Sequence, residues 1–160
     1  MRTSRGTIDI RRGAKYTMIK LSAFCDASYD LNTRQATACT VILSEMIFHA
    51  MFTNTYTDVE TSTRAELLGL IQTVRRVREI PDVEHTTIYC DSATNAKAFN
   101  SVIGSGVVQR DSKYYEDWCE LLSLCDGLNI EATHIYGHQM KHNPNKLCDV
   151  ICHSLLKAIK

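Results

Sequence analysis

The order of hydrophobic and polar positions along the chain predicts five strands. Residues 16–25 are apolar with little polar alternation, and Asp26 follows them directly. This pattern is typical of a central strand that is buried on both faces. The remaining predicted strands, which are separated by turn residues or by helical patterns, are 36–44, 46–53, 86–90 and 129–136.

Four helices are predicted after the first three strands. From Arg64 onward, leucine, isoleucine and valine recur at helical spacing, and Pro81 lies just past the last of them. The other predicted helices are 92–103, 113–125 and 145–160. This order of elements predicts a mixed sheet with helices on its faces. Ligands of such sheets gather at the carboxyl ends of parallel strands, where Asp26 and Asp91 are expected.

Length and composition narrow the class of protein. A chain of 160 residues forms one domain, and 44% hydrophobic with 22% charged residues are globular values that exclude collagen, coiled coil and disorder. No apolar run approaches the roughly 20 residues of a membrane span, and no signal peptide is recognisable. Seven cysteines, an odd number, indicate free thiols. We therefore expect a soluble cytoplasmic protein without a membrane partner.

The net charge of zero hides an asymmetry between the N-terminus and the rest of the chain. Residues 1–20 hold six basic residues and one acidic residue, whereas the other 140 residues hold 12 basic and 17 acidic ones. We expect a basic arm over 1–15 and a single domain over 16–160. Such an arm either contacts a polyanion or is a solvated tail.

Four acidic residues stand at informative places: Asp26, Glu66, Asp91 and Asp149. Each has an ordinary structural role, since the aspartates suit turns and helix starts, and Thr63 with Glu66 forms a capping box. The predicted elements can nevertheless bring all four together. Clustered carboxylates repel each other and suit hard divalent cations. Two such ions about 4 Å apart would activate a water and stabilise the leaving oxygen of a phosphodiester.

Four motifs in the chain match one family in order and at close spacings. They are 24–28 (FCDAS), 61–68 (TSTRAELL), 89–92 (YCDS), and 136–139 (YGHQ) followed by 145–149 (NKLCD). In these motifs the chain resembles type 1 ribonuclease H. The resemblance implies an α/β, RNase H-like fold, in which a central five-stranded mixed sheet has its first three strands antiparallel and helices on both faces.

The resemblance also implies a reaction and its residues. Asp26, Glu66, Asp91 and Asp149 would bind two Mg²⁺ ions, with Mn²⁺ as a possible substitute, and His138 would assist proton transfer or product departure. The expected activity is endonucleolytic hydrolysis of the RNA strand of an RNA–DNA hybrid. We expect a monomer, and no protein partner is evident.

Short polar residues are candidates for contacts with the nucleic acid. Ser62 and Thr63 stand where the family often has asparagines, and the ribose 2′-OH is the group that distinguishes RNA from DNA. Thr61 and Asn32 match positions that touch the backbone, and Ser28 is a further candidate. Each of these five residues is equally suited to a helix cap or a turn.

Three departures from the family pattern bear on this interpretation. Ala27 stands where the family usually has glycine, so the turn expected after Asp26 must have negative φ or shift slightly. Ala93 stands where a glutamine often contacts the minor groove. Residues 100–112 lack the basic, tryptophan-rich protrusion of many members. We expect the basic arm to substitute for it in part, through phosphate contacts.

Three rival functions remain open from the sequence. One is a nuclease of the same fold that acts on DNA junctions, and another is a nucleic-acid-binding domain that has lost catalysis. The third is an unrelated zinc site, whose histidine and cysteine spacings fit only loosely. Its candidate ligands are His134, His138, His142, Cys148, Cys152 and His153.

Overall fold

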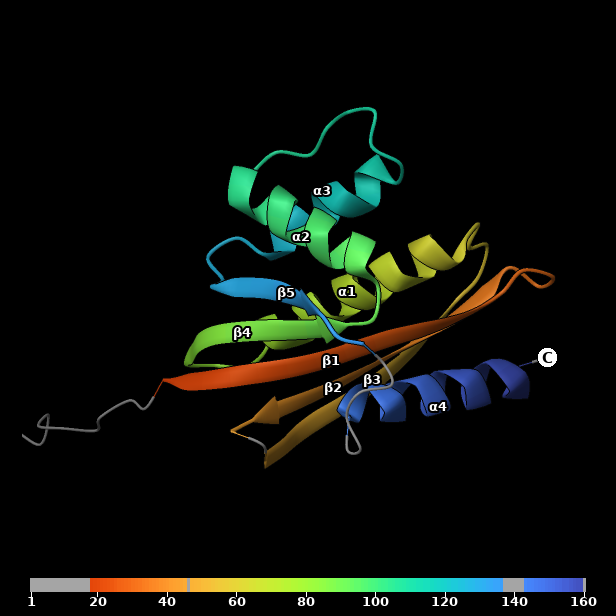
Figure 1. Ribbon diagram of the computed structural model, residues 1–160, viewed down its shortest axis with the longest axis horizontal. Helices are drawn as coiled ribbons and strands as arrows, with labels where there is room; N and C mark the ends of the chain where they lie inside the picture. The colour runs from red at the N-terminus through yellow and green to blue at the C-terminus, as the bar shows by residue number, and fades with distance from the viewer. Residues whose placement is uncertain (1–17, 46, 137–142, 160) are drawn as a thin grey trace, which may run out of the picture.

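A computed structural model describes residues 18–45, 47–136 and 143–159 of the chain. These residues form five strands and four helices (Figure 1). The strands are β1 (Ile19–Asp30), β2 (Gln35–Ser44), β3 (Ile47–Tyr56), β4 (Val83–Cys90) and β5 (Ile130–His134). The helices are α1 (Ser62–Arg78), α2 (Ala93–Ser105), α3 (Tyr115–Leu124) and α4 (Pro144–Ala158).

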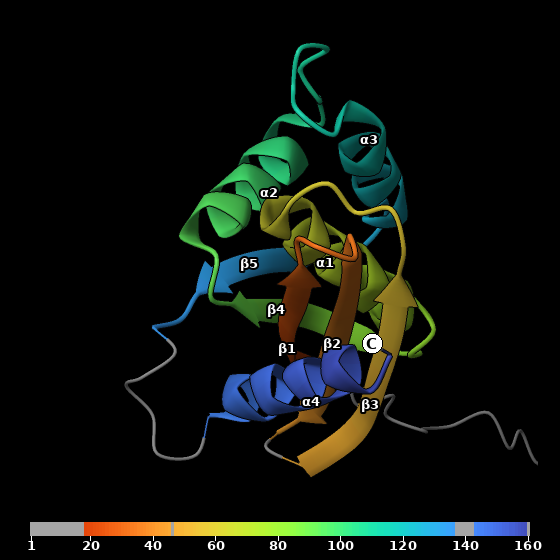
Figure 2. The ribbon, with the colours of Figure 1, turned by 90° about the vertical axis from the view of Figure 1, so that its right-hand side faces the viewer.

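The five strands form one mixed sheet in the order β3-β2-β1-β4-β5. β1 pairs antiparallel with β2, and β2 with β3, whereas β4 pairs parallel with both β1 and β5. α1, α2 and α3 lie on one side of the sheet and α4 lies on the other (Figures 1 and 2). The predicted fold class is therefore confirmed.

Side chains on β1 alternate between the two faces of the sheet. Leu21, Ala23 and Cys25 belong to the main core, which packs under α1 and extends to α2 and α3. Phe24 points the other way and packs against the smaller cluster beneath α4. Because both faces are covered, this strand is almost continuously apolar, as its sequence predicted.

β1 is longer than predicted, and Asp26 is not at its end. Its pairing with β4 stops at Phe24 and Tyr89, but its pairing with β2 continues through Asp26 to Asp30. The prediction of a turn at Asp26 and Ala27 is therefore wrong, because β2 provides backbone hydrogen bonds beyond the point where β4 ends. Ala27 is ordinary extended strand, so no glycine is needed there.

The segment between α2 and α3 also differs from the prediction. α2 continues through Gly104 and ends at Gly106, which has a φ of +67° in the left-handed region. α3 begins at Tyr115, directly after Tyr114, whose φ is +62°. No helix in the described ranges is long and apolar enough to cross a membrane. All seven cysteines are free, as expected, and six are buried.

Candidate active site

Three acidic side chains from three different elements meet at one point. Asp26 comes from β1, Glu66 from the second turn of α1, and Asp91 follows β4 directly. Each offers a carboxylate oxygen, and these three oxygens lie within 4.8 Å of one another. The fold brings them together because the β1–β4 pairing ends just before Asp26 and Asp91, and α1 crosses over β1 at this level. The predicted convergence of these three residues is thus present in the fold.

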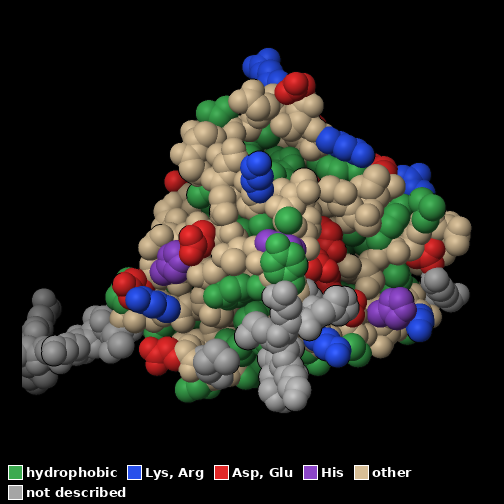
Figure 3. All heavy atoms as spheres, viewed as in Figure 1, with side chains coloured by type: hydrophobic (Ala, Val, Ile, Leu, Met, Phe, Trp, Pro, Cys, Tyr) green, Lys and Arg blue, Asp and Glu red, His purple; other side chains and the backbone are tan. Residues whose placement is uncertain are grey.

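The three carboxylates differ in their exposure to solvent. Asp26 is 4% exposed, Glu66 is intermediate, and Asp91 is exposed. Acidic side chains gather near the middle of one face of the molecule, the face seen in Figure 3. The site therefore opens to solvent on the Asp91 side and is closed on the Asp26 side.

Burial and mutual repulsion raise the pKa of the two less exposed acids. Burial, with the Asp91 charge next in importance, raises the pKa of Asp26 to about 7. Burial, with Asp26 next, raises the pKa of Glu66 well above its usual range. The backbone N–H of Ala27 donates to Asp26 Oδ1 at 2.9 Å and opposes this rise. The protein thus leaves the carboxylate charges largely uncompensated, which is the environment that a bound cation would stabilise.

Asp149 lies close to this group but outside it. Its charge contributes to the raised pKa values of both Asp26 and Glu66. Its exposed side chain is on α4, where its neighbour Cys148 donates to the Phe24 carbonyl at 3.5 Å and Cys152 to the Asp26 carbonyl at 3.4 Å. These contacts fix α4 along β1, so that Asp149 lies at the border of the site.

The N-terminus of α1 is capped by Thr61 and not by Thr63. Thr61 has extended backbone, and its Oγ1 accepts a hydrogen bond from the Arg64 N–H at 3.2 Å. The capping box of Thr63 and Glu66 is therefore not formed, because the helix begins two residues earlier than that motif requires. Glu66 belongs to the next turn, where its carboxylate faces Asp26 instead.

The five candidate nucleic-acid contacts lie in three places. Ser62 and Thr63 are exposed in the first turn of α1, next to the turn that holds Glu66. Ser28 is on β1, two residues beyond Asp26, and lines a cavity of about 310 Å³ against α4.

The other two candidates, Asn32 and Thr61, each form a hydrogen bond within the protein. Asn32 lies in the exposed turn after β1, where its N–H donates to Asp30 Oδ1 at 2.9 Å. It is roughly 20 Å along the strand from Asp26, by the rise of an extended chain. Thr61 shares a short hydrogen bond with the Tyr114 hydroxyl. The fold therefore brings Ser62 and Thr63 near the carboxylates, but not Asn32.

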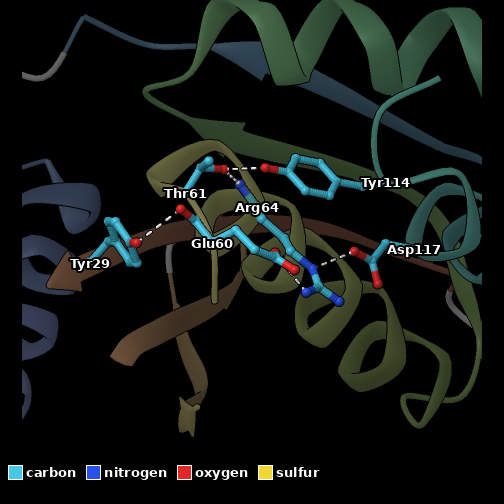
Figure 4. Close-up of polar contacts among 6 residues, drawn as sticks. All are labelled: Tyr29, Glu60, Thr61, Arg64, Tyr114 and Asp117. Carbon is cyan, nitrogen blue, oxygen red and sulfur yellow. Dashed lines mark hydrogen bonds and ion pairs between the residues drawn. The ribbon is translucent and has the colours of Figure 1, made fainter. Parts of the chain in front are cut away.

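A polar network ties the start of α1 to α3 (Figure 4). Arg64 donates from Nε to Asp117 and from Nη1 to Glu60, each at 2.8 Å. Its guanidinium also lies 5.7 Å from the centre of the Tyr114 ring. Hydrogen bonds to Asp117 and then Glu60 raise the pKa of Arg64 further above its usual range. The network fixes the turn that precedes Glu66.

Sequence reasoning missed Tyr114 and Asp117 as members of this network. Both are 53 residues from their partners Thr61 and Arg64, so no local pattern could pair them. The available signal was a pair of tyrosines with an acid just before Trp118, which is also what an ordinary helix start looks like.

Two further predictions, the catalytic role of His138 and the alternative zinc site, involve histidines. His138 and His142 lie outside the described residues. The described members of the zinc proposal do not gather: Cys148 and Cys152 point to backbone carbonyls, and His153 is exposed. Within the described ranges, Asp26, Glu66 and Asp91 form the only group of three potential metal ligands.

Solved structures of other proteins have the same fold as this chain. The chain matches structures of RNase H1 from Halobacterium salinarum (16% identity, 87% of this chain and 98% of that one, TM-score 0.68) and of the N-terminal RNase H domain of rv2228c from Mycobacterium tuberculosis (13%, 88% and 95%, TM-score 0.71). It also matches LC11-RNase H1, isolated from compost, in complex with an RNA/DNA hybrid (14%, 88% and 99%, TM-score 0.69). No curated protein matches the chain by sequence. A sequence model of the RNase H family covers residues 19–156, and the chain belongs to the RNase H family.

Proposed function

We propose that the protein is an endonuclease that hydrolyses the RNA strand of RNA–DNA hybrids. One observation carries the proposal, namely that Asp26, Glu66 and Asp91 bring carboxylate oxygens within 4.8 Å of one another. Family membership supports the reaction, and a structure of the same fold, LC11-RNase H1, is in complex with an RNA/DNA hybrid.

The carboxylates fit divalent cations with oxygen ligands. The donor set is entirely oxygen, and burial together with the repulsion between the carboxylates raises the pKa of Asp26 and Glu66. We propose that Asp26, Glu66, Asp91 and Asp149 hold two Mg²⁺ ions, which Mn²⁺ can replace. When bound, such ions supply Lewis acidity at the phosphodiester and lower the pKa of water.

We assign the remaining steps, substrate binding and proton transfer, to side chains of the protein itself. Asp91 is the exposed member of the group, so the scissile phosphate approaches from its side. Ser62 and Thr63 present hydroxyls next to the turn of Glu66, where they can bond to the ribose 2′-OH of the RNA strand. His138 assists proton transfer or product departure, because the unperturbed pKa of histidine lies near neutral pH.

Two rival functions differ from this one in substrate or in chemistry. A junction-cutting nuclease would use the same carboxylates without a need for the 2′-OH. A silent binding domain has no reason to retain carboxylates that raise each other's pKa. The clustered acids therefore argue against the second rival, and the substrate distinguishes the first.

Cleavage of a panel of end-labelled nucleic acids tests the proposal. The panel consists of an RNA–DNA hybrid, single-stranded RNA, duplex RNA and a four-way DNA junction, each with Mg²⁺ or Mn²⁺. We expect cuts in the RNA strand of the hybrid alone. Cutting of the junction alone would establish the rival nuclease, and tight hybrid binding without any cut would establish the binding domain.

A further inference from the structure

The strand β3 is an edge of the sheet whose only protective feature among the described residues is one β-bulge. It pairs with β2 along its whole length, and no described residue pairs with its outer side. Its ten residues, IFHAMFTNTY, include no lysine, arginine, aspartate, glutamate or proline. Edge strands of natural proteins usually carry such residues, because an open row of N–H and C=O groups otherwise recruits another strand.

The opposite edge of the same sheet provides an internal comparison. β5 has only five residues, one of which is the exposed Glu131. It therefore has two of the devices that discourage pairing, shortness and charge. β3 has one interruption, a bulge at His49, which leaves the seven residues from Ala50 to Tyr56 in regular register. The difference between the two edges points to a strand partner for β3.

Exposed apolar side chains lie along β3 on the face of the sheet that α4 covers. Met51 is opposite Val41 and Phe48 is opposite Leu43, and side chains in register point to the same face. Val41 and Leu43 are buried in the cluster beneath α4. Their neighbours on β3 extend beyond the helix, so Phe48 is 62% and Met51 44% exposed.

α4 continues this apolar surface. Ile151 packs against the same buried cluster, and Leu147 lies one turn before it on the same side of the helix. Leu147 is 49% exposed. Asp149 lies between them in sequence but faces away, toward Asp26 and Glu66. Leu147 and Ile151 thus lie on a different side of α4 from Asp149.

We propose that the outer edge of β3 pairs antiparallel with β3 of a second copy of this chain. A two-fold axis perpendicular to the sheet brings identical surfaces together and puts both α4 helices on the same face. Phe48 and Met51 of both copies then form one continuous apolar surface on that face.

Charge and exposed apolar surface both favour a second copy as the occupant. Identical residues meet near a two-fold axis, and a strand without formal charge produces no repulsion there. A strongly acidic or basic partner would find no complementary charge on this strand. The pairing would also remove the exposed apolar surface of Phe48 and Met51 of both copies from water.

The dimer leaves both active sites open. β2 and β1 separate the interface from β4, and Asp91 follows β4. The proposal is independent of the nuclease function, since β3 contributes none of the three clustered carboxylates. It replaces the expectation of a monomer, because the sequence pattern alone does not reveal which predicted strand forms an unprotected edge.

Sedimentation velocity of the full chain, from about 1 to several hundred micromolar, tests the proposal. The test variant is Thr53→Lys, at an exposed position of β3, and the matched control is Thr133→Lys, at an exposed position of β5. We expect wild type and the control to show the same monomer–dimer equilibrium, and Thr53→Lys to raise the dissociation constant at least about tenfold. Met51→Glu should act in the same direction.

Circular dichroism and the cleavage rate per chain show whether each variant remains folded. A wild type that sediments as a monomer over the whole range would overturn the proposal. So would a dimer that both β3 variants leave unchanged while they remain folded, since another surface would then form it. If the wild type itself cuts no nucleic acid, circular dichroism alone reports folding, and sedimentation still reports association directly.

Discussion

At the scale of single residues, the raised pKa of Asp26 makes the free energy of unfolding depend on pH. The pKa is about 7 in the folded protein, against a usual value of about 3.8. Between these two values the folded state holds a proton that the unfolded state has lost. Stability of the metal-free protein therefore falls as the pH rises through this window, and the loss is complete above pH 7.

Asp26→Asn removes this penalty while it keeps an oxygen to accept from the Ala27 N–H. In EDTA at pH 8 we expect the variant to exceed wild type by roughly 2–4 kcal/mol in free energy of unfolding, and to match it near pH 4. Urea unfolding at both pH values measures the difference. A variant that is less stable than wild type at pH 8, or a difference independent of pH, would contradict the predicted linkage.

Arg64 and Arg75 provide a second comparison between residues. Arg64 bonds in two directions, to Asp117 and Glu60, and its side chain is 28% exposed, whereas Arg75 pairs with Glu120 at an exposed position. Lysine cannot reproduce the planar two-way contact. We expect Arg64→Lys to lower the free energy of unfolding by about 1–2 kcal/mol, and Arg75→Lys to change it by less than about 0.5 kcal/mol. Urea unfolding measures both losses. Equal losses would show that the two-way contact of Arg64 adds no stability beyond that of an exposed ion pair.

At the scale of elements, the prediction from sequence succeeded where a pattern was local. The apolar period of α1, its end before Pro81 and the buried character of β1 could all be predicted from neighbouring residues. The extension of β1 beyond Asp26 could not, because it depends on pairing with β2. The cap at Thr61 was missed for a similar reason, since Thr61 and Thr63 are both acceptable caps in sequence and the packing of α1 decides between them.

Two glycines, Gly69 inside α1 and Gly106 at the C-cap of α2, predict opposite effects on stability. A Cβ at Gly69, inside α1, would lie 3.6 Å from Ala38 Cβ and 3.9 Å from the Asp26 carbonyl oxygen, both ordinary contacts. Gly69→Ala should therefore raise the free energy of unfolding by about 0.5–1 kcal/mol through helix propensity.

Gly106 is the matched comparison. Its φ of +67° is unfavourable for alanine although no atom lies near its Cβ position. Gly106→Ala should lower the free energy of unfolding by about 1–2 kcal/mol. Thermal unfolding of both variants checks the direction of each change in stability. A destabilised Gly69→Ala would show that β2 packs too closely to α1 for the extra methyl.

At the scale of the whole molecule, the sequence predicted the fold class and the convergence of four acids, three of which form one group in the structure. Asp26, Glu66 and Asp91 meet because their motifs sit on elements whose order defines the sheet. Asp149 lies at the border of the group, and His138 remains a prediction because it falls outside the described residues. The link from Arg64 to α3 could not be predicted, since it joins residues far apart in the chain.

The basic arm gives a prediction that concerns binding and not chemistry. Its excess of positive charge suits phosphate contacts that depend on salt. Deletion of residues 1–14 should raise KM and flatten its dependence on salt, with kcat nearly unchanged. Steady-state cleavage of a hybrid at several salt concentrations measures both, and an unaltered KM would show that the arm makes no contact.

The most direct measurement is cleavage of an RNA–DNA hybrid by wild type, Asp91→Asn and Asp126→Asn, each in Mg²⁺ and in EDTA. Asp126 serves as the matched control because it lies in the turn after α3. We expect wild type and Asp126→Asn to cut the RNA strand at similar rates in Mg²⁺ and not in EDTA. Asp91→Asn should be slower by about 100-fold or more. Cutting by Asp91→Asn at the wild-type rate, or cutting that persists in EDTA, would contradict a metal-dependent site built on these carboxylates.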